Sequence, residues 1–165
     1  GRLVSLDVKQ ASIKPSRKKG WESYQQKQYN ASTKEYDLVT KYKKVHYNEF
    51  FGTNSVSLTV EYKLISTETG EILKTNLISE TLEDEVWYIT YDANTKNLLS
   101  GSWSNKLINS DTDVINTSYQ DRRQIQNLLK ANRKLISTEE LKNTALKNVS
   151  AQAVNEINAY NPEED

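Results

Sequence analysis

The sequence predicts an α+β fold, with an antiparallel-rich sheet of about four to five strands and C-terminal helices packed on one face of that sheet. Two observations predict it. In the first half of the chain apolar and polar residues alternate with the two-residue period of a strand. From Ile125 onward the apolar residues recur with the 3.6-residue period of a helix. Strands that precede helices along the chain are typical of this class.

Length and composition limit the possible classes of protein. The chain has 165 residues, the size of one ordinary domain, so we expect one α/β domain over residues 1–165. Its 22 basic and 22 acidic residues balance, which argues against a strong general attraction to nucleic acid. It has no cysteine, which excludes disulfides and thiolate zinc sites in this sequence.

The clearest element is a β-hairpin in the middle of the chain. Apolar and polar residues alternate from Val56 to Leu64, as in an antiparallel strand with one face in water. Ser66–Gly70 follows as a turn, with Gly70 suited to a left-handed backbone conformation. Glu71–Thr81 then returns as the partner strand.

Two further strands are expected before this hairpin. Leu3–Val8 alternates, and places three residues on one side of a strand: Val4, Leu6 and Val8. Glu35–Tyr47 alternates as well. The polar stretch 16–34 between them predicts an exposed loop, and 48–54 predicts a turn in which Gly52 has a positive φ.

After the hairpin the pattern changes. Val86–Tyr91 is rich in β-forming residues and predicts one more strand, whereas 92–113 predicts a long loop. Ser118 is a candidate cap for a first helix, and Ser137-Thr138-Glu139-Glu140 is a capping box for a second. Pro162 and the acidic residues after it end the chain as a frayed tail.

The hairpin sequence resembles a known group of proteins. Its alternating strand, followed by Thr67-Glu68-Thr69-Gly70-Glu71-Ile72, is similar to the strand–turn–strand of bacterial envelope lipoproteins in the curli-secretion-channel and penicillin-binding-protein-activator group. Ala145–Ile157 is similar to their Ala-rich terminal helix, so that the likeness covers about a third of the chain. The resemblance implies a non-catalytic periplasmic domain, tethered to the outer membrane by a lipid anchor that would lie outside this sequence.

Few residues suggest chemistry. His46 is the single histidine, and its place in a predicted strand is typical of a structural residue rather than of a catalytic or metal site. Asp111 and Asp113 begin like a calcium loop, but the glycine and the closing glutamate at the required spacing are missing. We therefore expect no catalytic residue, no metal and no cofactor.

A set of aromatic residues is the best candidate for a binding site. Four of them lie on the predicted strand and in the loop after it: Trp87, Tyr88, Tyr91 and Trp103. Aromatic side chains that are exposed together form protein-binding or sugar-binding patches, although strand alternation also allows some of these four to be core. We expect them to contact a partner, either envelope proteins or a second copy of the chain.

Two alternative functions remain open. Glu83 and Glu85, beside Trp87, could act on a glycan, although a solvated turn between two strands is the simpler interpretation of this acidic run. Arg17-Lys18-Lys19, with nearby aromatic residues, could touch nucleic acid, but the zero net charge argues against a nucleic-acid partner. The leading expectation is therefore a non-enzymatic binding or assembly component in the periplasm.

Overall fold

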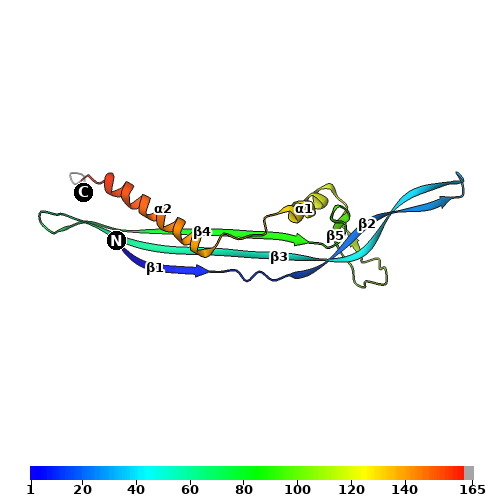
Figure 1. The fold of residues 1–165 in the computed structure, drawn as a ribbon, viewed down its shortest axis with the longest axis horizontal. Coiled ribbons are helices and arrows are strands. Elements are labelled where there is room, and N and C mark those ends of the chain that lie inside the picture. Colours follow the sequence, from blue (N-terminus) through cyan, green and yellow to red (C-terminus); the bar gives the residue numbers. More distant parts are fainter. Residues whose placement is uncertain (162–165) are drawn as a thin grey trace. The chain divides into compact units, whose positions relative to one another are not determined.

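The computed structural model describes residues 1–161, so the predicted frayed tail from Pro162 lies outside the described residues. Half of the chain is strand and 22% is helix, which confirms the α+β class. The strands are β1 (Arg2–Lys9), β2 (Ser16–Asn30), β3 (Glu35–Ile65), β4 (Ile72–Thr90), β5 (Leu98–Ser102) and β6 (Val114–Ile115). The helices are the 3-10 turn η1 (Thr95–Asn97), α1 (Tyr119–Lys130) and α2 (Thr138–Asn158) (Figure 1).

The six strands form an antiparallel sheet with β3 as its longest member. β1 pairs with β3 over residues 55–61, and β2 pairs with β3 over residues 35–49. β4 also pairs with β3, while β5 pairs with β2 and β6 pairs with β5. The described sheet thus has six strands, one more than the upper end of the prediction.

The chain forms two compact units, to both of which β3 and β4 contribute. The first unit contains residues 1–12, residues 52–85 and the described residues from 134 onward. In it α2 packs on β3 and β4 through a core of five buried residues: Leu58, Tyr62, Ile78, Ala145 and Val149. The opposite side of these strands carries cross-strand hydroxyl pairs, Ser57 with Thr81 and Thr59 with Ser79, each 2.9 Å apart. This polar side explains the strict alternation in the sequence.

β1 differs from its prediction in which residues share a side. Its register with β3 shifts between Leu3 and Ser5, so an extra residue, Val4, is inserted there. Leu3 rather than Val4 therefore lies opposite Val60, on the side of the strand that also carries Leu6.

Asn54 ties three segments of the first unit together. Its Oδ1 accepts a hydrogen bond from the Ala11 amide at 2.9 Å, and its Nδ2 donates to the Ile136 carbonyl at 2.8 Å. The Ile136 amide in turn donates to an Asp84 carboxylate oxygen at 2.7 Å. Asp84 is thus a structural acceptor, since it fixes the segment that leads into α2.

The second unit contains residues 13–51 and 86–133. Its sheet carries a buried cluster on each of its two faces. One contains Trp21, Leu99 and Trp103, with Tyr42 and Ile115 packed against it. The other contains Ile89, Leu98 and Ile125, and α1 covers it with Leu128 and Leu129. The adjacent residues Leu98 and Leu99 belong to different clusters because successive side chains of a strand point to opposite faces.

Two glycines allow the Trp21 and Trp103 cluster to close. A Cβ on Gly101 would lie 2.1 Å from the Val114 carbonyl oxygen and 2.7 Å from the Trp21 ring. A Cβ on Gly20 would lie 2.9 Å from the Leu99 carbonyl oxygen. Glycine at both positions therefore lets backbone and indole rings approach closely.

Several predicted segments are confirmed. The hairpin formed by β3 and β4 turns at residues 66–70, where Gly70 has a φ of 75°. Ser118 caps α1 by accepting from the Asp121 amide, and Ser137 caps α2 by accepting from the Glu140 amide, each at 3.1 Å. Both caps satisfy an amide that the helix itself leaves unpaired.

Other predicted segments are wrong. Residues 16–30 of the expected loop 16–34 form strand β2, and the expected turn at 48–54 is the middle of β3, where Gly52 has no positive φ. The acidic residues 83–85 lie within β4 rather than in a turn, and the expected loop 92–113 contains η1 and β5. Among the described residues no helix combines the length and hydrophobicity needed to cross a membrane.

Candidate protein-binding site

The hairpin between β2 and β3 extends beyond the rest of the sheet of the second unit. β5 pairs with β2 only at Gly20–Glu22, and β6 does not pair with β2 in the described part of the chain. β4 does not reach the tip of this hairpin either. Its Trp87 contacts Glu49 of β3, and β4 ends only three residues later, at Thr90. Residues 24–41 therefore form a two-stranded ribbon, which we call the arm (Figure 1).

The arm holds its own register through local contacts. Tyr29 lies directly opposite Tyr36, and their rings meet edge to face with centroids 5.4 Å apart. Asn30 Nδ2 donates to Asp37 at 2.8 Å, and the Lys34 amide donates to the Asn30 carbonyl at 2.9 Å. Lys34 closes the turn with a φ of 60°, in the left-handed region.

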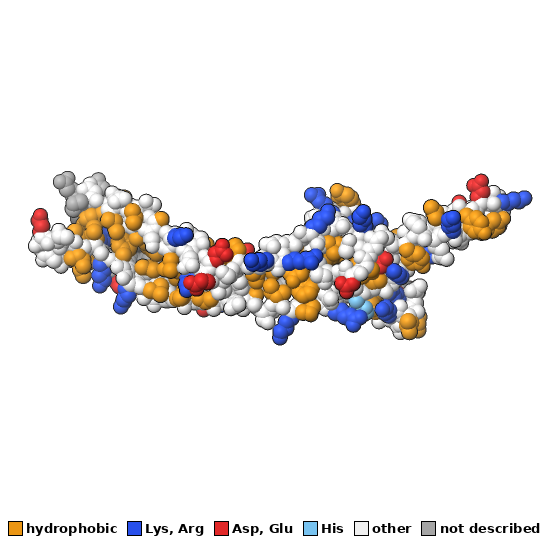
Figure 2. Space-filling model, viewed as in Figure 1, with side chains coloured by type: hydrophobic (Ala, Val, Ile, Leu, Met, Phe, Trp, Pro, Cys, Tyr) orange, Lys and Arg blue, Asp and Glu red, His pale blue; other side chains and the backbone are white. Residues whose placement is uncertain are grey.

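Apolar side chains lie exposed at the end of the arm. Tyr29, Tyr36 and Leu38 are 55%, 69% and 67% exposed. The register puts all three on one side, because Leu38 lies opposite Lys27, two residues before Tyr29. We call these three residues the arm face, and Figure 2 shows hydrophobic side chains gathered at this end of the hairpin.

The exposed aromatic face makes the arm a candidate binding site. A two-stranded ribbon by itself is only marginally stable in water, and each of its edges presents unpaired backbone groups. Tyrosine gives a large contact area with few rotatable bonds, which favours its use at protein interfaces. The arm thus combines an edge that can accept a strand with an apolar face that a partner can cover.

The four aromatic residues expected from the sequence are not gathered into one patch. Trp87 is 41% exposed, and its Nε1 donates to Glu49 at 3.1 Å. Tyr88 follows it on β4, points to the other face, and stacks on Phe50 with ring centroids 4.7 Å apart. The placement of these two leaves Trp87 as the more accessible of the pair.

The other two aromatic residues pack in the interior of the second unit. Tyr91 contacts the cluster around Ile89, and its hydroxyl donates to Glu22. Burial, together with the Glu22 carboxylate, raises the pKa of Tyr91 well above its usual value. Trp103 is only 6% exposed, and its Nε1 donates to the Gly20 carbonyl at 3.1 Å. Its indole ring therefore stabilises the unit rather than presenting a surface.

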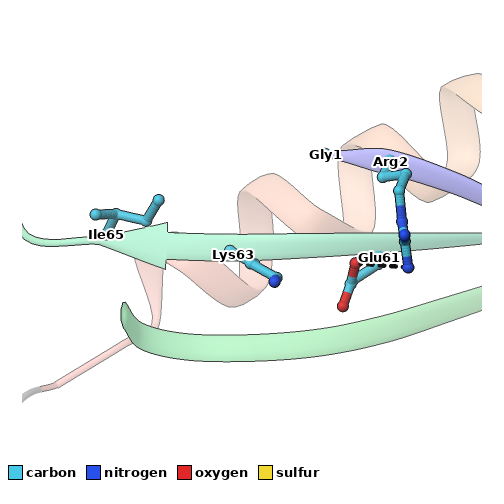
Figure 3. Close-up of a pocket in the computed structure, with 5 residues that line it drawn as sticks. All are labelled: Gly1, Arg2, Glu61, Lys63 and Ile65. Atoms are coloured by element: carbon cyan, nitrogen blue, oxygen red, sulfur yellow. Dashed lines mark ion pairs between the residues drawn. The ribbon is translucent and has the colours of Figure 1, made fainter. Parts of the chain in front are cut away.

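The first unit offers a second unpaired strand edge. Among the described residues β1 pairs only with β3, and its apolar residues Leu3, Leu6 and Val8 stay partly exposed. An open pocket of about 400 Å³ lies beside the start of this strand, and Figure 3 draws the residues that line it. Two of its lining residues, Arg2 and Glu61, form an ion pair of 3.3 Å.

The side chains of the acidic run 83–85 point to both faces of β4. Glu83 and Glu85 are exposed and lie on the same face of β4, since they are two residues apart in a strand. Asp84 points to the other face and accepts from the Ile136 amide. In the described part of the chain no group of three or more potential ligand residues could hold a metal ion.

The sequence contained a signal for the arm that the loop prediction overlooked. Tyr29 and Tyr36 are placed symmetrically about the polar turn Ala31–Lys34, as expected for cross-strand partners of a hairpin. Residues 25–28 are all polar, so both faces of the strand are polar there and the two-residue period cannot be seen in the sequence. This led to the loop prediction. The arm face therefore has to be identified from its structure, because comparison with known proteins gives no guide. No family model, no curated protein and no solved structure matches this chain.

Proposed function

We propose that this chain is a non-catalytic binding or assembly component that acts through protein contacts, with the arm as its docking surface. One observation carries the proposal. The arm exposes three large apolar side chains on one face of a ribbon that has no third strand within the described residues. Burying such a face and pairing its edge would release water from apolar surface and satisfy backbone groups.

The partner that fits this surface is a protein with an extended segment. An added strand on β2 or β3 of the arm would hydrogen-bond to the backbone, and alternate apolar side chains would cover Tyr29, Tyr36 or Leu38. Residues near the tip carry both signs of charge, Lys34 beside Glu35 and Asp37, which suits a polar rim around an apolar centre.

Site-specific crosslinking in the native cell tests this proposal. We would place a photoreactive phenylalanine analogue at Tyr36, and at Leu77 of β4 as a matched exposed control that is 58% accessible. We expect one discrete crosslinked protein from position 36 and none from position 77. Replacing Tyr29 and Leu38 by serine should abolish the adduct while far-UV circular dichroism stays unchanged. Equal labelling at both positions would refute the arm as the docking surface.

A second copy of the chain is the alternative occupant of the arm. Sedimentation of the purified chain over a range of concentrations distinguishes this case, because self-association through the arm would shift with concentration and disappear in the serine variant. If position 36 gives only a self-adduct in cells, the chain is an assembly component that binds itself.

The proposed location is the periplasm, with the natural precursor anchored to the outer membrane. It is supported by the resemblance of residues 55–73 to envelope lipoproteins. Metabolic labelling of the native gene product with a fatty acid, followed by membrane fractionation, tests it. Labelled protein in the membrane fraction would support the location, and unlabelled protein in the cytosol would contradict it.

A further inference from the structure

A cluster of cations surrounds the single histidine in the second unit. In the antiparallel register of β2 and β3, Lys19 lies directly opposite His46, and Arg17 is two residues from Lys19 on the same side of the sheet. Arg17 Nη2 lies 3.3 Å from His46 Nδ1. Since a guanidinium can only donate, Nδ1 is the acceptor and the imidazole is neutral in this arrangement.

Trp103 fixes the positions of two members of this cluster. Its ring meets the His46 ring edge to face, with centroids 4.8 Å apart. The Lys19 ammonium lies 4.8 Å from the centre of the Trp103 ring and donates to the Trp103 carbonyl at 2.6 Å. Because Trp103 is buried, the histidine and the ammonium are held against a rigid support.

The cations of the cluster lack the carboxylate partners that other cations nearby possess. Three other lysines of the second unit form ion pairs: Lys18 with Glu49, Lys43 with Glu22, and Lys44 with Asp113. Within the described residues Arg17, Lys19 and Lys106 form no ion pair. Figure 2 shows the histidine, in pale blue, next to basic side chains.

The field of these cations acts on the histidine. Burial lowers the pKa of His46, and Arg17, Lys106 and Lys19 lower it further by repelling a proton. Lys44 is the next cation on the same side of β3, but the Asp113 carboxylate balances its charge. The net local field therefore comes from three uncompensated cations.

A groove begins at the same side chains. It has a volume of about 640 Å³, and Arg17, Lys18 and Lys19 line it together with Ser100, Gly101, Ser102, Val114, Asn116 and Tyr47. Among the residues that the structure describes, no carboxylate lines this groove, and its uncharged polar residues can donate through hydroxyl, side-chain amide and backbone groups. Past Gly20 the edge of β2 has no β5 residue opposite it, which leaves the groove open.

We propose that the cluster of Arg17, Lys19 and His46 binds a phosphate-type oxyanion, carried either by a soluble compound or by a lipid headgroup. Arginine offers two parallel donors to such a group, and the lysines add point charges. An arriving anion would also stabilise the protonated imidazole, so that His46 takes up a proton from solvent and Nδ1 changes from an acceptor to a donor.

His46 gives a direct test because the chain has only one histidine. Its imidazole proton signals can be followed by NMR through a pH titration, first in chloride and then in phosphate at equal ionic strength. We expect phosphate to raise the pKa of His46 by about half a unit or more, in a saturable manner, because a bound opposite charge favours the protonated ring. Identical titrations in chloride and phosphate would overturn the proposal.

Variants separate a bound ion from general screening. Arg17→Gln and Lys19→Gln alter exposed side chains, so we expect folding to be retained and the phosphate-dependent shift to be lost. Lys27→Gln is the matched control, since Lys27 is exposed on the arm and forms no ion pair within the described residues. A shift that persists in both cluster variants, or that disappears equally in the control, would also refute the site.

The source of the phosphate group is distinguished by two further measurements. Sedimentation with vesicles of phosphatidylglycerol and phosphatidylcholine, compared with phosphatidylcholine alone, tests a lipid headgroup. Retention that needs Arg17 and Lys19 identifies the lipid, whereas the NMR response without retention identifies a soluble phosphate compound. Either result supports the proposal. The proposed anion site is independent of the arm, because Tyr29, Tyr36 and Leu38 take no part in it.

Discussion

Replacing Trp103 by alanine should unfold the second unit far more readily than replacing Trp87. Both residues were expected from the sequence to contact a partner, but Trp103 is 6% exposed and Trp87 is 41% exposed. The same substitution at the two positions therefore separates a core residue from an accessible one. Both tryptophans lie in the second unit, so the comparison is made within one folded body.

The magnitudes follow from the buried areas. Truncating a buried tryptophan to alanine typically costs about 3–5 kcal/mol, and at Trp103, which is 6% exposed, we expect roughly 4 kcal/mol. The lost hydrogen bond to the Gly20 carbonyl adds to this cost. Trp87 is 41% exposed, so it buries roughly two thirds as much of its side chain, and the same scaling gives roughly 2.5 kcal/mol.

Urea unfolding followed by far-UV circular dichroism measures both variants without using tryptophan fluorescence, which the substitutions change. We expect the midpoint of Trp103→Ala to fall well below that of Trp87→Ala. A loss of less than about 1 kcal/mol at Trp103 would refute its place in the core. A lower affinity for the partner crosslinked at position 36, without lower stability, would mark Trp87 as a contact residue.

Two more predictions concern charged groups. A hydrogen bond from Tyr62, together with those from two amide side chains, lowers the pKa of Glu156. The ionised carboxylate therefore stabilises the folded chain above the ordinary pKa of 4.5, and this contribution is lost as pH falls through the lowered pKa. Glu156→Gln should therefore flatten the decline of stability in acid, which thermal unfolding between about pH 2 and 6 measures, whereas an unchanged acid profile would contradict the contact. Lys44→Met should release the loop after β5, because the Lys44 ammonium holds two carbonyls and a carboxylate there. Amide hydrogen exchange should then speed up within 104–113 and stay unchanged in α2, and equal exchange in the loop before and after the change would count against this role.

The elements that could be predicted from the sequence are strands with one solvent-exposed polar face and helices with a capping serine. Val56, Leu58 and Val60 alternate with serine and threonine because the other side of these strands carries hydroxyl pairs instead of a core. Ser118 and Ser137 mark their helices because a cap depends on only three or four consecutive residues.

The strands that could not be predicted from the sequence are those without one apolar and one polar face. β2 is polar on both sides along much of the arm, so its period is lost and the stretch resembles a loop. β5 has the opposite difficulty, because Leu98 and Leu99 are both buried, one on each face, between polar segments typical of loops. Only pairing with Trp21 and Glu22 shows that these residues form a strand.

The candidate sites depend on the register between strands. Residue type alone suggests Arg17, Lys18 and Lys19 as one basic run, but the pleat sends Lys18 to the Glu49 side and leaves the other two beside His46. Likewise, the four predicted aromatic residues are close in sequence yet lie in different environments. Whether the chain behaves as the single domain expected from its length stays a prediction.

The ammonium of Lys44 performs within the second unit the task that many small domains give to a bound calcium ion or a disulfide. It is surrounded by three loop oxygens: the carbonyls of Asn105 and Ile108 at 2.7 and 2.6 Å, and the Asp113 carboxylate at 2.6 Å. All three of its protons are used, and the charge is balanced within the site. This covalently attached cation cannot be chelated or reduced, so the loop between β5 and β6 stays held whatever the metal content or redox state of the surroundings.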